Sequence, residues 1–111
     1  MTKNYKVLIL TEPTAGNEDR YNNYYEHTHL EEVLQTTSLH SAQRFKLAGN
    51  AGETAPLPYL AVYEASGNSA EEVLADLSAR RQEREQSDAL NLRTGRVWVF
   101  EEIGPKHERS Q

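Results

Sequence analysis

Three tyrosines and two histidines are concentrated in residues 21–29, the segment whose side chains are best suited to chemistry. Tyr21, Tyr25 and His29 are spaced at i, i+4 and i+8, so on a helix they share one face. An imidazole can move a proton at neutral pH, and a phenol can donate a hydrogen bond to a developing enolate oxygen. The spacing therefore indicates an acid/base site in which His29 moves the proton and Tyr25 assists.

These side chains also have structural interpretations. Buried tyrosine and histidine need hydrogen-bond partners, so His29 could instead bond a backbone carbonyl and fix the helix end, and Tyr21 could pack in the core. A metal site is not expected, because His27 and His29 lie about 200° apart on a helix and the chain has no cysteine. A nucleotide cofactor is not expected either, since the glycine-containing segment 49–52 precedes a loop and not a helix.

Further side chains are candidates for contacts with a substrate. They are Tyr21, Tyr24, Arg44, Phe45, Tyr63 and Trp98. A guanidinium forms paired hydrogen bonds with a carboxylate, so Arg44 could hold an acidic substrate; a salt bridge with Glu64 or Glu101 across the sheet is the alternative. Tyr63 could line the same cavity, whereas Trp98 has the alternative of a core or dimer-interface position.

Four strands and two helices are expected to position these residues. The strands are predicted at 5–11, 41–47, 59–65 and 96–103, where β-branched, leucine and aromatic residues are concentrated. The first helix should begin after Asn17 and run to about His29, with a bend or a second short helical turn near Leu30 because the apolar stripe shifts there. The second should begin at Ser69, with Glu72 completing a capping box.

The remaining segments are read as loops and polar ends. The segment 79–86 is almost entirely polar and is interpreted as a solvated helix end or loop. The loop 48–58 contains two glycines and two prolines, and its length suggests a mobile flap or an arm that reaches a partner. Residues 1–105 are assigned to a single domain and 106–111 to a polar tail.

The predicted order β-α-β-β-α-β favours an α+β fold of the ferredoxin-like type. In this fold a four-stranded antiparallel sheet carries both helices on one face. Because both faces of the strands are apolar, we expect the open face to pack on a second copy and form a homodimer, a dimeric α+β barrel. The interface residues are expected among Val7, Ile9, Tyr59, Ala61, Val97 and Val99 or their alternates.

Composition narrows the function classes. The net charge of −5 argues against a nucleic-acid partner, whose phosphates attract basic surfaces. The absence of cysteine fits a reducing compartment, and no apolar run approaches the length of a membrane span. A cytoplasmic protein with no membrane partner is therefore expected.

A motif that begins at Tyr24, with the sequence YYExxHLxxVL, extends across the predicted bend. It resembles the W-Y-D-x-x-H-hydrophobic-x-x-V-hydrophobic pattern of EthD-like proteins of the dimeric α+β barrel superfamily. The strands SAQRF (41–45), YLAVYE (59–64) and VWVFE (97–101) are similar to strands of that group, in the same order. The chain departs from the pattern at Tyr24, where tryptophan is commoner, and at Glu31, where a proline often stands.

The resemblance implies a pocket between the helices and the sheet of each subunit, but it does not imply one reaction. The superfamily includes muconolactone-type isomerases, polyketide cyclases, cofactor-free monooxygenases and haem-degrading enzymes, and function resides in sites and not in folds. The second helix has no histidine to bind haem. Two hypotheses follow: a cofactor-independent isomerase, cyclase or lyase acting on a small carbonyl, aromatic or polyketide-like compound, or a non-catalytic dimer that binds a small organic ligand.

Overall fold

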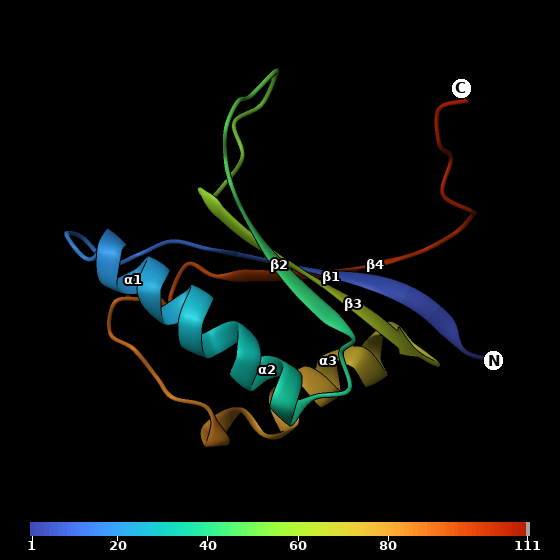
Figure 1. Ribbon diagram of the computed structural model, residues 1–111, viewed down its shortest axis with the longest axis horizontal. Coiled ribbons are helices and arrows are strands. Elements are labelled where there is room, and N and C mark those ends of the chain that lie inside the picture. Colours follow the sequence, from blue (N-terminus) through green and yellow to red (C-terminus); the bar gives the residue numbers. More distant parts are fainter. Residues whose placement is uncertain (111) are drawn as a thin grey trace.

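The chain forms a four-stranded antiparallel sheet with all of its helices on one face (Figure 1). The computed structural model describes residues 1–110. The strands are β1 (Lys3–Thr11), β2 (Ser41–Lys46), β3 (Tyr59–Gly67) and β4 (Arg96–Glu101), and the helices are α1 (Glu18–Tyr24), α2 (Leu30–Thr36) and α3 (Ala70–Ala79). The strand order is β2-β3-β1-β4. The α+β, ferredoxin-like fold predicted from the sequence is confirmed.

Helices α1 and α2 are two parts of one continuous helix, joined by a π-helical turn over Tyr25–His29. The backbone N–H of Leu30 bonds to the carbonyl of Tyr25, five residues earlier. The wider turn absorbs one extra residue, so the buried residues Tyr21 and Tyr25 before it and Leu30 and Val33 after it all face the sheet. The shift of the apolar stripe was correctly located in the sequence: a second helical segment, α2, begins at Leu30, and the cause of the shift is a π turn and not a bend.

The core lies between this long helix, α3 and one face of the sheet. Strand β1 is central, because it pairs along its length with β3 and also pairs with β4. Its inward residues Tyr5 and Val7 are buried beside Ala61 and Tyr63 of β3. The inward face is therefore the one that carries the tyrosines of both layers.

The opposite face of the sheet is apolar and uncovered. Leu8 pairs with Val62 on one side and with Trp98 on the other. Trp98 is 42% exposed and Phe100 is 56% exposed. These residues alternate along their strands with the inward residues, such as Val7. Both faces of the sheet are therefore apolar, as the sequence predicts. In Figure 1 the β2–β3 loop and the C-terminal segment both rise on this side of the sheet.

The β2–β3 loop is held in place by its own hydrogen bonds, whereas the C-terminal tail is exposed. In the β2–β3 loop, the side chain of Asn50 donates to the carbonyls of Gly52 and Glu53 and accepts from the backbone of Ala55. The described part of the predicted tail, 106–110, is exposed, and residue 111 lies outside the described residues. Within residues 1–110, no helix is both long enough and apolar enough to cross a membrane.

The start of α3 generates a stability prediction. The Ser69 hydroxyl accepts from the backbone N–H of Glu72, while the Glu72 carboxylate accepts from the backbone N–H of Asn68, one residue before the cap. Because an N-cap side chain satisfies an otherwise unpaired backbone donor, Ser69→Ala should lower the free energy of unfolding in urea by about 1 kcal/mol. Ser69→Asp, which keeps an acceptor, should be close to the unmodified protein; equal loss in both variants would contradict the capping role.

Candidate functional site

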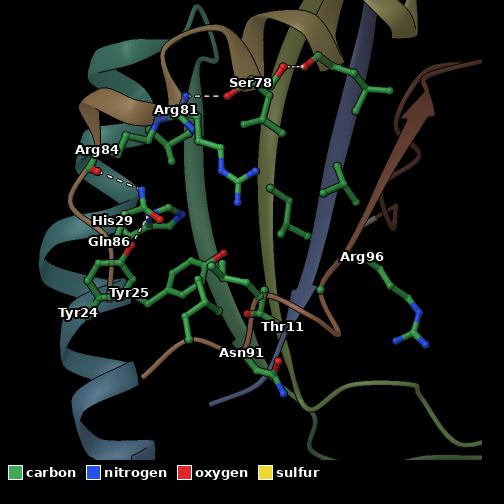
Figure 2. A pocket seen from close by; sticks show the side chains of 18 residues that line it. Thr11, Tyr24, Tyr25, His29, Ser78, Arg81, Arg84, Gln86, Asn91 and Arg96 are labelled. Carbon is green, nitrogen blue, oxygen red and sulfur yellow. Dashed lines mark hydrogen bonds between the residues drawn. The ribbon is translucent and has the colours of Figure 1, made fainter. Parts of the chain in front are cut away.

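A cavity of about 380 Å³ lies between the long helix, the segment that follows α3, and the ends of β1 and β4. Most of its wall is apolar, formed by Ile9, Val33, Leu74, Leu77, Leu90, Leu92 and Val97. The polar groups are concentrated on the helix side, where Tyr24, Tyr25 and His29 meet the turn that carries Arg81 and Arg84 (Figure 2). An apolar pocket with a few convergent polar groups is the usual form of a small-molecule site.

The π turn decides which tyrosine bonds to His29. The hydroxyl of Tyr24 lies 3.1 Å from His29 Nδ1 and also donates to the backbone carbonyl of Glu85 at 2.8 Å. A phenol has one proton; since Tyr24 gives it to Glu85, the bond with His29 must be donated by Nδ1–H. The Nε2 atom therefore carries the lone pair, which makes this ring nitrogen a proton acceptor.

The cavity keeps His29 uncharged. Burial lowers the pKa of His29 from its ordinary value of 6.5 to about 4, and the positive charges of Arg84 and Arg81 contribute in the same direction, against an opposing effect of Glu32. A proton-moving role at neutral pH predicts a pKa near neutrality for His29, and its pKa departs from that prediction. The imidazole is neutral at pH 7 and ready to accept a proton, but it is a weak base until its surroundings change.

Tyr25 contributes a hydroxyl whose neighbours are the hydroxyls of Thr11 and Tyr63. The side chain is 2% exposed and lines the cavity, and its ring meets the His29 ring edge-on at a centroid distance of 4.8 Å. Burial raises the pKa of Tyr25 well above its ordinary value. The group therefore stays protonated and can donate a hydrogen bond to an oxygen of a bound molecule.

The segment 79–86 supplies residues that the sequence analysis did not assign to the site. After α3 the chain makes a 3-10 turn over Arg81–Glu83 and folds back, so that Arg84 is only 7% exposed. Its Nε donates to the Thr36 hydroxyl and its Nη2 to the Leu77 carbonyl, each at 2.7 Å. The interpretation of this run as solvated is thus wrong for Arg84. Its composition contains no signal that separates one buried arginine from exposed neighbours.

Three of the predicted site residues form a packed layer beside the cavity and do not line it. Tyr21 is fully buried, with its hydroxyl 2.5 Å from Thr11 Oγ1, and Tyr63 is fully buried at the level of the sheet. The Arg44 guanidinium lies over the rings of Tyr21 and Tyr25, with its carbon 5.0 Å from the Tyr25 centroid. These contacts fix the position of Tyr25 from the side opposite the cavity.

The partners of Arg44 differ from both sequence-based alternatives. Its Nη2 donates to the side chain of Asn22 at 2.6 Å, and its ion pair is with Glu26 of the helix at 3.5 Å. Glu64 and Glu101 pair instead with lysines of β1. The guanidinium thus connects β2 to the helix.

Phe45 and Trp98 belong to the uncovered face of the sheet. Both alternate with inward residues on their strands, and both are partly exposed, at 45% and 42%. The sheet therefore separates them from the cavity of the same chain. Of the predicted site residues, the structure brings together Tyr24, Tyr25 and His29 around one cavity.

Comparisons of the chain with protein-family models, with curated proteins and with solved structures found no match. Within the described part of the chain, no three acidic or histidine side chains come together in a group that could hold a metal ion.

The lowered pKa of His29 generates a prediction about stability and pH. Because the unfolded chain binds a proton near pH 6.5 and the folded chain only near pH 4, this residue's contribution to stability is complete above pH 6.5 and is lost as the pH falls toward 4. We expect a loss of about 2 kcal/mol after allowance for solvent screening. Urea unfolding at pH 7 and pH 4.5 measures it.

Two variants isolate this contribution of His29. His29→Gln should show a shallower dependence of stability on pH than the unmodified protein, whereas His27→Gln, which alters an exposed residue of the same turn, should retain the full dependence. Equal slopes in all three proteins would show that the His29 proton does not contribute to folding.

Proposed function

We propose that the protein is a cofactor-independent enzyme that moves a proton on a small carbonyl compound, with His29 as the general base. The observation that carries this proposal is the hydrogen-bond chain from His29 Nδ1–H to Tyr24 and from Tyr24 to the Glu85 carbonyl. A base held in one tautomer by a second group, with its other nitrogen toward a pocket, is the arrangement that general-base catalysis uses. Isomerases, cyclases and lyases share this step.

The proposed step begins with a carbonyl compound in the cavity, its acidic C–H directed at His29 Nε2. The C–H bond breaks, the proton passes to Nε2, and the electron pair moves onto the carbonyl oxygen to give an enolate. The Tyr25 hydroxyl, which lines the cavity, donates a hydrogen bond to that oxygen. The imidazolium then returns the proton to another atom of the same molecule or to the leaving group, and neutral His29 is restored.

The surroundings of His29 favour such a step in two ways. The mostly apolar wall of the cavity strengthens the interaction between a developing oxyanion and its donors. The positive charge of Arg84 also stabilises an enolate, although it disfavours the imidazolium. An enolate anion formed beside His29 therefore raises the basicity of the imidazole as the reaction proceeds. The resemblance to EthD-like proteins is compatible with chemistry of this kind.

A second candidate function is a binding module without catalysis. It is favoured by one observation, the pKa of about 4 for His29, which describes a neutral histidine held by Tyr24. In this case the cavity holds a metabolite and His29 only accepts a hydrogen bond from it. Turnover and binding, measured on the same compounds, separate the two functions.

We also propose that the protein is a homodimer formed through the uncovered sheet face. Apolar side chains on four adjacent strands form this face, among them Phe45, Leu60, Leu8 and Trp98. A continuous apolar patch of this kind marks an interface. The β2–β3 loop and the C-terminal segment rise on the same side (Figure 1), which supports their packing around a second copy.

The first test replaces His29 after a screen of lactones, β-dicarbonyls and polyketide-like phenols has identified a compound that turns over. General acid/base groups contribute about 100–10,000-fold, so His29→Ala should lower kcat/KM by that order. Tyr25→Phe should cost less, since it removes one hydrogen bond and keeps the ring. Full activity of His29→Ala in a folded protein would place the base elsewhere.

A matched control for this test is His27→Ala, which removes an exposed imidazole from the same turn and should leave kcat/KM unchanged. Tyr24→Phe should retain binding but lower kcat, because Nδ1 loses the acceptor that fixes the tautomer. If compounds bind to the cavity and none turns over, the binding module is the correct function.

The dimer generates a separate prediction. Trp98→Glu places a charge on the uncovered face and should convert a dimer of 12.6 kDa chains into monomers in sedimentation velocity at micromolar concentration. Ala75→Glu makes the same charge change on the exposed side of α3 and should stay dimeric. A stable 12.6 kDa monomer for the unmodified protein would contradict the proposed assembly.

A further inference from the structure

The charge of the cavity is opposite to the charge of the chain. The protein has 17 acidic and 12 basic residues, yet the cavity is lined by Arg81, Arg84 and Arg96 and by no aspartate or glutamate. Arg96 points away from the other labelled side chains, whereas Arg81 and Arg84 stand beside His29 on one wall (Figure 2). A concentration of positive charge without acidic neighbours suits an anion.

Arg84 is the central group on this wall, because it is buried and unpaired with any acid. Its five N–H groups make two bonds, to a hydroxyl and to a backbone carbonyl, which leaves three without an acceptor in the described chain. No carboxylate in residues 1–110 forms an ion pair with Arg84 or Arg81. Burying a cation of this kind costs free energy of desolvation unless a negative charge pairs with it.

The nearest acidic side chains have other partners. The Glu32 carboxylate accepts from the backbone N–H of Glu85 at 2.7 Å, and Asp76 accepts from both the backbone N–H and the hydroxyl of Ser38. Both act on Arg84 through space and raise its pKa, but neither forms an ion pair with it. A carboxylate in direct contact with the guanidinium would therefore come from outside the described chain.

We propose that the ligand of this cavity carries a carboxylate, which binds the free N–H groups of Arg84 with support from Arg81, while the rest of the ligand occupies the apolar part beside Tyr25 and His29. The inference rests on the proposed function only in assuming that the cavity takes a small organic molecule. It adds the chemical class, a carboxylic acid with an apolar or aromatic body.

A carboxylate fits this wall better than other anions. It is planar and matches the guanidinium fork, which gives two parallel hydrogen bonds. Arg81 is exposed and its charge is screened by solvent, so the charge that burial leaves uncompensated on this wall is that of Arg84, which a singly charged carboxylate balances. The leucine and valine side chains on the remaining wall would contact a hydrocarbon body.

The test compares phenylacetate, phenylacetamide and phenyl phosphate in titrations followed by protein NMR, including the side-chain Nε–H signal of Arg84. Phenylacetate should bind about 10- to 100-fold more tightly than the isosteric amide, the range expected for hydrogen bonds to a charged group. It should shift signals of Arg84 and of residues that line the cavity. Equal affinity for acid and amide, no binding of any probe, or tighter binding of phenyl phosphate would overturn the assignment.

Variants locate the bound charge. Arg84→Lys keeps the charge but removes the fork, and Arg81→Met removes an exposed partner without disturbing buried bonds; each should weaken phenylacetate binding and leave phenylacetamide unchanged. Arg109→Met makes the same charge change in the exposed C-terminal segment and should have no effect. Unchanged phenylacetate affinity in both cavity variants would show that the arginines do not bind the anion.

The outcome for the ligand class is separate from the outcome for catalysis. Selective phenylacetate binding that persists in His29→Ala supports the carboxylate site whether or not any compound turns over. Turnover of neutral carbonyl compounds that depends on His29, with no preference for acids, would support the enzyme and overturn the carboxylate site.

Discussion

One main-chain hydrogen bond, from the Leu30 N–H to the Tyr25 carbonyl, sets the geometry on which the cavity depends. A regular helix would turn Leu30 and Val33 away from the sheet once Tyr21 and Tyr25 faced it. The wider turn lets both pairs be buried in one continuous helix. It also brings side chains five residues apart together, which is why Tyr24 reaches His29. The same adjustment thus satisfies the core and builds the polar side of the cavity.

The fold was predictable because its signals are local. Strand positions followed from runs of β-branched and aromatic residues, and the cap at Ser69 followed from its type and its spacing to Glu72. Side chains alternate along β2, so Arg44 faces the helices and Phe45 the uncovered face, although both were candidates for substrate contacts. Asn17 occupies the predicted N-cap position, but its side chain bonds to Thr14 instead of capping the helix. The sequence pattern predicted where the helix begins, but it did not predict which hydrogen bond the side chain of Asn17 makes.

The site was predictable only in part, because its remaining half depends on contacts distant in sequence. His29, Tyr24 and Tyr25 were found from residue type and spacing. Arg84 was not, since its burial depends on Thr36 and Leu77 accepting its N–H groups. The burial that lowers the pKa of His29 is a property of the assembled walls as well. Residue type and spacing in the sequence therefore identified the side chains on the helix side of the cavity. The burial of the arginine on the charged side depends on tertiary packing, which the sequence pattern does not show.

The central place of β1 in the sheet has a consequence for how the chain acquires its structure. Its two neighbours, β3 and β4, begin at Tyr59 and Arg96. Strand β1 is therefore synthesised well before either of the strands with which it pairs. Closing such long chain segments costs entropy before any contact offsets it, which slows folding. During synthesis β1 therefore stays unpaired until β3 has emerged, and its other edge stays open until β4 follows.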